Sequence, residues 1–309
     1  MSTFADRASS IAATEPARPL ERSAPRAAPK LGTLRELYAA ARLDLAEVRR
    51  SRWLIFSGVI YALLAGIFVL VGMRESSLLG FTGMGRVLLS FVHALLLLLP
   101  LLALMATGQV INRAREDGTI ELLFSHPMRR TTFFVAVSLT RFLVLVVPLV
   151  VLMLAMGIFG RLAFGDAIPW GFLLRALAIS AASIAAFAGL GIAISTFVRS
   201  QAKALIWMLV AWAGGVALLD FGLVGLMLQW QLNPQSVFIL AALNPVQAAR
   251  MALLSGVQPD LAVLGPVGFF LANRIGAAAL LALGIAWPAV FGLGAWFLSL
   301  VRFRSGDLV

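Results

Sequence analysis

The sequence predicts an all-α polytopic membrane protein with six transmembrane helices. Of its 309 residues, 61% are hydrophobic and only 13% are charged, and its mean hydropathy is +0.96. A soluble domain has about 25% charged and about 45–50% apolar residues. Apolar runs of about 20 residues recur along the chain, and each is long enough to cross a hydrocarbon core of about 30 Å.

Two segments precede the predicted spans. Residues 1–30 are rich in Pro, Ala, Arg and Ser, so we expect a disordered basic tail with nothing to pack. Residues 31–52 follow with apolar residues three and four positions apart, which indicates an amphipathic helix in the headgroup plane. A soluble linker helix is the alternative. The apolar positions are Leu34, Leu37, Ala41, Leu45 and Val48.

The six predicted spans contain few polar side chains. Charge is expensive inside a bilayer and often marks function, so His93, Arg141 and Asp220 are candidate intramembrane sites. For Asp220 the alternative is a position at a span end, and for His93 it is a hydrogen-bonded packing role. The spans are expected at 53–72, 87–110, 133–160, 170–198, 204–228 and 276–301.

The distribution of Lys and Arg predicts the orientation of the spans. With the N-terminus inside, the cytoplasmic segments hold 18 basic residues and the outer ones hold six. Cytoplasmic loops carry this excess, so we expect a multi-pass protein of a bacterial inner membrane with both termini cytoplasmic. The net charge of +11 then faces the anionic lipid bilayer, and no nucleic-acid partner is needed to explain it.

A long outer segment, residues 229–275, separates the last two predicted spans. Asn233-Pro234 and Asn244-Pro245 each resemble a helix start, with Asn as the cap and Pro in the first turn. Short helices at the outer surface, or a re-entrant hairpin, fit this pattern. Residues expected to face an outer partner are Asn233, Asn244, Pro245 and Arg250.

The residues needed for catalysis or cofactor binding do not occur in recognisable patterns. The chain has two histidines and no cysteine, and no zinc-protease or paired-carboxylate spacing is present. The phosphate-binding pattern G-x-x-x-x-G-K-[ST] is also missing. We therefore predict a non-enzymatic chain that binds no metal or cofactor itself, with ATP and Mg on another chain if ATP drives it.

The segment after the second predicted span carries the most specific pattern. Residues 119–124 are expected to form a short helix that Pro127 ends near Ser125. Acidic residues gather toward its start, where the helix dipole favours anions, and an apolar Leu-Leu-Phe patch follows. A solvated juxtamembrane loop is the alternative. The candidate residues are Glu116, Asp117, Gly118, Thr119, Glu121, Leu122, Leu123, Phe124, Ser125 and Pro127.

Residues 115–127 resemble the coupling-helix segment of ABC-2 type permeases, roughly E-x-G-T-x-E-x-L-x-S-x-P followed by a basic residue. The matching residues are Glu116, Gly118, Thr119, Glu121, Leu123, Ser125, Pro127 and Arg129. The resemblance implies a homodimer or pseudo-dimer with a helix docked in a cleft of a separate ATPase. It also implies that 31–52 is an elbow helix and 53–304 the transmembrane domain.

Shorter strings resemble, within that family, the permeases of nitrous-oxide reductase maturation. These strings are Arg50–Trp53, Gly80–Gly83, Leu99–Leu104 and Leu243–Pro245. This resemblance implies a cytoplasmic ATPase, a periplasmic accessory protein and a role in copper-sulfur centre assembly. The alternatives are an ABC-2 exporter permease for a drug, lipid or polysaccharide, and an ion-coupled secondary transporter. For the latter, only Asp220 offers an intramembrane carboxylate.

Overall fold

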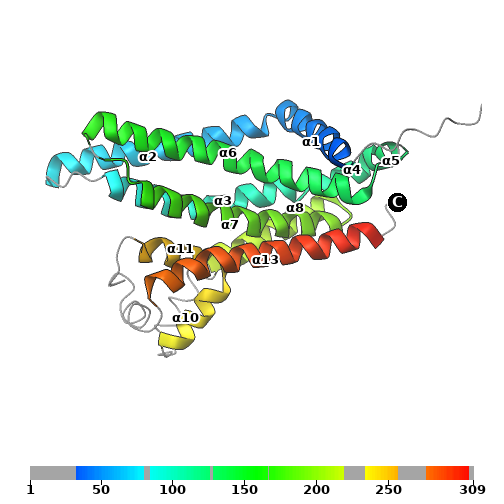
Figure 1. The fold of residues 1–309 in the computed structure, drawn as a ribbon. Helices are drawn as coiled ribbons and strands as arrows, with labels where there is room; N and C mark the ends of the chain where they lie inside the picture. The colour runs from blue at the N-terminus through cyan, green and yellow to red at the C-terminus, as the bar shows by residue number, and fades with distance from the viewer. Residues whose placement is uncertain are drawn as a thin grey trace, which may run out of the picture. The chain divides into compact units, whose positions relative to one another are not determined.

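The structure of the chain, a computed structural model, describes residues 33–79, 84–125, 128–165, 167–218, 234–256 and 276–305. The predicted tail 1–30, Pro127, Asp220 and Asn233 lie outside these ranges. Within them every regular element is a helix (Figure 1). The helices are α1 (Thr33–Arg50), α2 (Trp53–Leu79), α3 (Met84–Thr107), α4 (Val110–Glu116), α5 (Thr119–Phe124), α6 (Arg130–Phe164), α7 (Trp170–Phe197), α8 (Gln201–Trp212), the π-helix η1 (Ala213–Leu218), α10 (Pro234–Leu243), α11 (Pro245–Ser255) and α13 (Ala277–Ser305).

The all-α, membrane-spanning class predicted from composition is confirmed at this level. Four helical segments of the described chain are long and apolar enough to cross a bilayer: Val87–Glu116, Arg130–Ala163, Trp170–Phe197 and Ala277–Ser305. A fifth is added if Leu34–Arg50 and Ile55–Val71, which meet at 60°, are counted as one bent span. The count of six stays a prediction, because the described part of 204–228 ends at residue 218.

Helices α3 and α7 form the centre of the bundle. α7 packs against α13, α3 and α6, and its buried side chains are mostly Ala, Ser, Gly and Ile. Small residues let helix backbones approach closely in membranes. A methyl group at Gly189 of α7 would collide with the backbone carbonyl of Gly292 on α13. The small side chains of α7 therefore determine how closely its neighbours pack.

Residues 234–255 form the two short helices predicted there, α10 and α11, and their position at the outer surface stays a prediction. Asn244 caps α11, since its Oδ1 accepts a hydrogen bond from the Val246 N–H at 2.9 Å, with Pro245 at the first turn. The Asn244 amide also donates to the backbone carbonyl of Gly215 in η1. α11 packs against α13 and α7, so at least this helix belongs to the bundle.

Helix α1 forms where the periodicity predicted it, but one of its faces differs from the expectation. Its buried positions are four residues apart, and α6 is its main neighbour. Two of them are acidic. The apolar Leu34, Tyr38 and Leu45 are exposed on the described chain. The Asp44 carboxylate faces inward because α6 presents Arg141 there, whereas Glu36 Oε2 is buried with no hydrogen-bond partner on the described chain. The buried positions are Glu36, Ala40, Asp44 and Val48.

Candidate functional site

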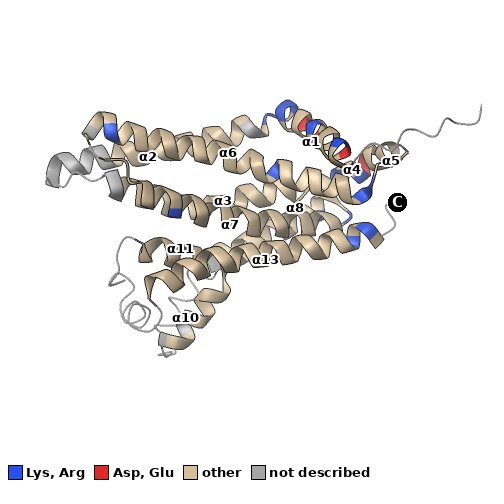
Figure 2. Ribbon diagram, viewed as in Figure 1, with Lys and Arg blue, Asp and Glu red and all other residues tan. Residues whose placement is uncertain are grey.

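Charged residues of the described chain gather at one end of the bundle. Figure 2 shows them on α1, on α4 and α5, and at the C-terminal end of α13. The short helices α4 and α5, which hold the candidate motif, lie at this end (Figure 1). Any function of the motif therefore depends on how α4 and α5 are attached to the long helices.

Helix α4 starts with a cap supplied by another helix. Its own N-cap residue, Gln109, makes no side-chain cap. Instead Ser195 Oγ on α7 accepts hydrogen bonds from the N–H groups of Ile111 at 2.8 Å and Asn112 at 3.3 Å. The same hydroxyl donates to Asn112 Oδ1 at 3.1 Å. The first N–H groups of a helix lack partners within it, so Ser195 joins the start of α4 to the end of α7.

A tight turn at residues 117–118 separates α4 from α5. Gly118 has φ of 67°, in the left-handed region, where side chains other than Gly are disfavoured. It is the N-cap of α5, and the Leu122 N–H donates to its carbonyl at 3.2 Å. Gly118 thus has a conformational role in the motif, because its left-handed backbone lets α5 begin after a turn of only two residues, 117 and 118.

The inner face of α5 is anchored in an apolar cluster. Ile120 is buried with residues from α4, α6, α7 and α13, and Leu123 and Phe124 pack against them. The Phe124 and Phe133 rings meet edge-on with centroids 6.0 Å apart, a favourable aromatic geometry. We call this group the α5 anchor cluster. Its buried members are Ile111, Ile120, Phe133, Phe134, Val137, Ile192 and Phe303.

The outer face of α5 is exposed and carries both charge and one large apolar side chain. Leu122 is 70% exposed, and Thr119, Glu121 and Asp117 are also exposed. Ser125 Oγ donates to the Leu122 carbonyl at 2.7 Å and so closes the last turn. The predicted Leu-Leu-Phe patch is therefore divided between the two faces. Leu123 and Phe124 hold the helix, and Leu122 is presented outward.

Two further contacts tie α4 to the helices behind it. The Glu116 carboxylate accepts hydrogen bonds from the Gln201 N–H at 3.1 Å and from Gln201 Nε2 at 2.6 Å. A carboxylate there caps the start of α8, where the helix dipole favours a negative charge. Arg115 Nη1 donates to the Thr196 carbonyl of α7 at 3.1 Å. A displacement of the α4–α5 unit would therefore pull on α7 and α8 together.

The predicted intramembrane cation Arg141 lies on α6 and is only 7% exposed. Its Nη2 donates to Asp44 Oδ1 at 2.8 Å and to Glu47 Oε1 at 3.4 Å, both on α1. Burial raises the pKa of the Asp44 carboxyl above its ordinary value, more than the Arg141 charge lowers it. Since desolvation outweighs attraction, the pair gives α1 a defined position on α6 rather than a large net stability.

The other predicted site residues do not gather at the motif. His93 is half-buried on α3. Asn244 and Arg250 are both buried on the described chain, which differs from the expected position facing an outer partner. The reason for Asn244 is its double hydrogen bonding to α11 and η1. Pro245 begins α11.

Four residues that hold helices in place are absent from the predicted site. Asp44 and Glu47 pair with the Arg141 cation and so position α1 on α6. Ser195 and Gln201 stand at the ends of two apolar runs and hold α4. A polar residue at the last turn of a predicted span, close in the membrane plane to a motif loop, is the signal that could have found Ser195.

The comparisons with known proteins agree with this geometry. Residues 38–308 match the sequence profile of the ABC-2 family transporter proteins. The chain belongs to the ABC-2 transporter family. It is also 27% identical over 250 residues to a probable ABC transporter permease protein NosY of Pseudomonas aeruginosa, covering 75% of this chain and 85% of that protein. A probable NosY permease of Stutzerimonas stutzeri is 24% identical over 277 residues, covering 83% and 95%.

This membership confirms the resemblance to ABC-2 type permeases predicted from the sequence. The chain is a multi-pass ABC-2 permease that resembles NosY permeases. Permeases of this kind are transmembrane subunits and not catalytic ones. The match covers α2 through α13 and most of α1, so the anchored α4–α5 unit lies well inside the family's region.

Proposed function

We propose that this permease works with a separate cytoplasmic ATPase, and that the outer face of α5 is the surface on which the ATPase docks. The chain acts as two copies, with six spans each and both termini in the cytoplasm. ATP and Mg bind to the partner chain. The observation that carries the proposal is the two-faced α5, which is buried on the anchor cluster and exposed at Glu121 and Leu122.

The contacts of α4 support a mechanical role for this unit. A docking helix transmits force only if it is fixed to the elements that must move. Ser195 and Arg115 connect the unit to α7, and Glu116 connects it to α8. Closure of the ATPase would therefore move α7 and α8 through these hydrogen bonds. Those that involve the charged Arg115 and Glu116 are stronger than hydrogen bonds between neutral groups.

Substitution of the exposed α5 face tests the docking surface. We expect Glu121→Lys to abolish co-purification with the ATPase while membrane insertion is unchanged. Leu122→Ala removes an exposed apolar contact and should weaken association about 5- to 30-fold, corresponding to ~1–2 kcal/mol. The measurements are pull-down of the ATPase and ATP turnover of the complex.

A matched control separates docking from general charge effects. Ser236→Lys adds a positive charge at an exposed position of α10, at the opposite end of the bundle from α5 (Figure 1), and should leave association intact. If Glu121→Lys and Leu122→Ala complexes co-purify and hydrolyse ATP like the parent, α5 is not the docking surface. If Ser236→Lys disrupts the complex equally, the loss is a general effect of added charge and not of the α5 face.

The proposed topology has its own test. Charged residues lie mainly at the α4–α5 end, and the excess of Lys and Arg in the predicted inner segments supports cytoplasmic placement of that end. Reporter fusions at Gly256 should read as periplasmic, and fusions after Val309 as cytoplasmic. Fusions that place both positions on the same side of the membrane would contradict the six-span arrangement.

Within the family we propose a narrower role in maturing the copper-sulfur centre of nitrous-oxide reductase. The similarity to two NosY permeases over most of the chain supports it. The chain has no cysteine and two histidines, so it is poorly equipped to carry soft copper ions itself. A sulfur species or a mechanical signal to a periplasmic accessory protein is the better candidate for what it transmits.

Deletion of the gene tests this narrower role. We expect the deletion strain to export reductase polypeptide that lacks its catalytic copper-sulfur cluster, as measured by metal content and activity. Complementation with the parent gene should restore the cluster, and complementation with Glu121→Lys should not. A deletion strain with fully loaded, active reductase would rule out the maturation role and leave the general permease role standing.

A further inference from the structure

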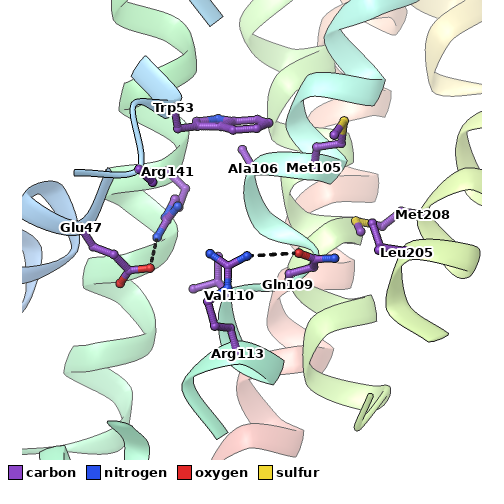
Figure 3. A pocket seen from close by; sticks show the side chains of 11 residues that line it. Glu47, Trp53, Met105, Ala106, Gln109, Val110, Arg113, Arg141, Leu205 and Met208 are labelled. Carbon is purple, nitrogen blue, oxygen red and sulfur yellow. Dashed lines mark hydrogen bonds and ion pairs between the residues drawn. The ribbon is translucent and has the colours of Figure 1, made fainter. Parts of the chain in front are cut away.

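A cavity opens beside the bend between α1 and α2, away from the exposed face of α5. Its volume is about 140 Å³, and it is lined from α1, α2, α3, α4, α6 and α8 (Figure 3). Several lining residues are exposed, among them Met105 and Leu205, so the cavity communicates with the surface. Because the amphipathic α1 ends here and the apolar α2 begins, the cavity lies where a headgroup layer would meet the chain.

The bend itself brings polar groups to the cavity. Arg52 has φ of 57°, a left-handed conformation that is uncommon outside glycine. This residue turns the chain between Ser51 and Trp53, both of which line the cavity. The Trp53 Nε1 is buried and has no hydrogen-bond partner on the described chain. A buried N–H without a partner is costly, and an acceptor inside the cavity would satisfy it.

The walls of the cavity divide into an apolar side and a polar side. Figure 3 shows Met105, Leu205 and Met208 on one side, with the Arg141–Glu47 pair opposite and Trp53 across one end. At the other end lies Arg113, whose Nη2 donates to Gln109 Oε1 at 3.4 Å. Such a combination suits an amphiphile, with its polar head on the charged wall and its chain against the methionines and Leu205.

The charges on the polar side balance. Arg141 Nη2 forms ion pairs with Asp44 Oδ1 at 2.8 Å and with Glu47 Oε1 at 3.4 Å. Arg113 makes no ion pair with a carboxylate in the described ranges. The charges of Asp44, Glu47, Arg141 and Arg113 therefore sum to zero. If Asp44 neutralises Arg141, the Glu47 carboxylate on α1 and the Arg113 guanidinium on α4 remain to interact with a ligand. A purely anionic headgroup would be attracted by the charge of Arg113 but repelled by the charge of Glu47.

We propose that this cavity binds the headgroup of a zwitterionic phospholipid that carries a primary ammonium, as in phosphatidylethanolamine. Arg113 holds the phosphate, Glu47 accepts hydrogen bonds from the ammonium, and the Trp53 indole N–H at the opposite end donates to an ester carbonyl of the same lipid. A quaternary ammonium has charge but no N–H to donate, and a glycerol headgroup has hydroxyl donors but no cation, so only the primary ammonium gives Glu47 a charge-assisted hydrogen bond. Bound there, the lipid would connect α1 to α4.

Lipid retention by the purified full-length chain tests the proposal, and it needs no ATPase, so it is independent of the proposed function. The delipidated protein in detergent is mixed in turn with phosphatidylethanolamine, phosphatidylglycerol and phosphatidylcholine of identical acyl chains. Bound lipids are counted by native mass spectrometry. We expect phosphatidylethanolamine to be retained about fivefold better than the other two, the scale of one partly exposed charge contact.

Two variants and one control identify the cavity as the place of binding. Arg113→Gln and Glu47→Gln should each reduce phosphatidylethanolamine retention about fivefold. Arg42→Gln removes an exposed cation of α1 that does not line the cavity, so retention should be unchanged. The Arg113 side chain bonds to Gln109, whereas α1 is held through the Asp44–Arg141 pair. We therefore expect the Arg113→Gln variant to keep α1 in place, which an unchanged unfolding midpoint verifies.

Soluble phosphoethanolamine serves as a competitor in the same measurement. Its ability to displace the lipid at millimolar concentration would show that the headgroup is recognised in addition to the acyl chains. Equal or better retention of phosphatidylglycerol would overturn the proposal in favour of a simple anion site. Unchanged retention by Arg113→Gln would overturn it in favour of lipid bound elsewhere on the bundle.

Discussion

Helices α1 and α5 both lie at the charged end of the bundle, and they are attached to the long helices by different kinds of contact. α5 is held by the apolar anchor cluster around Phe133, Phe134 and Phe303. α1 is held on α6 by a buried face that includes the Asp44–Arg141 ion pair. The apolar attachment sums many small contacts, whereas the ionic attachment depends on two atoms being in the right place.

The two attachments respond differently to the loss of a side chain. An apolar cluster loses stability in proportion to the surface removed. A buried ion pair loses far more when one partner is removed than when both are replaced, because a lone buried charge remains. The apolar contacts of α5 would allow small shifts of this helix on its cluster. The ion pair of α1 requires a single position of this helix on α6.

The largest effect is expected from removing one half of the ion pair. Arg141→Leu leaves the Asp44 carboxylate buried, 4% exposed, without its cation. We expect the free energy of unfolding in detergent to fall by about 4 kcal/mol. Thermal unfolding of the purified chain measures this. The double variant Asp44→Leu with Arg141→Leu should recover most of the loss, and a double variant as unstable as the single one would refute a purely electrostatic cause.

The next effect comes from the anchor cluster. Phe303→Ala removes a ring that contacts Phe124, Phe133 and Phe134. We expect about 3 kcal/mol of destabilisation, together with faster amide hydrogen exchange in α5. The matched change Phe297→Ala, at an exposed position of α13, should cost much less. Equal costs at the two positions would mean that the cluster is not what holds α5.

A smaller effect is expected at the cap that joins α4 to α7. Ser195→Ala removes the acceptor of the Ile111 and Asn112 N–H groups. The expected cost is about 1–2 kcal/mol, typical of a lost cap with buried donors. Ser305→Ala, an exposed hydroxyl that bonds only within α13, serves as control. Hydrogen exchange should report the loss at the start of α4, and protection there equal to the parent would contradict the capping role.

The smallest effect concerns pH. Burial raises the pKa of Asp44 above the ordinary value, so the folded state binds its proton more tightly than the unfolded state. Stability from this group therefore falls as pH rises from the ordinary value of about 3.9 through the raised pKa, and the loss is complete above it. The unfolding midpoint of the parent minus that of the Asp44→Leu, Arg141→Leu double variant should show this slope. A difference that grows with pH would have the wrong sign.

Sequence reasoning went furthest where the signal is local. The helix over Thr119–Phe124 follows from short-range rules for proline and for acidic residues at a helix start, and the structure has the helix at those bounds. α10 and α11 follow from Asn-Pro pairs in the same way. The long apolar helices follow from composition alone, because the bilayer requires backbone hydrogen bonds within each helix.

The all-α membrane class, most of the helices and the family motif could therefore be predicted from local sequence patterns. Tertiary structure alone decided that Asp44 and Glu47 face Arg141, that Ser195 caps α4, and that Leu123 and Phe124 turn inward while Leu122 turns outward. The physical reason is that helical periodicity shows which residues share a face but not what lies opposite that face. Partners that are more than 80 residues apart in the chain, such as Ile111 and Ser195, meet only once the bundle has packed.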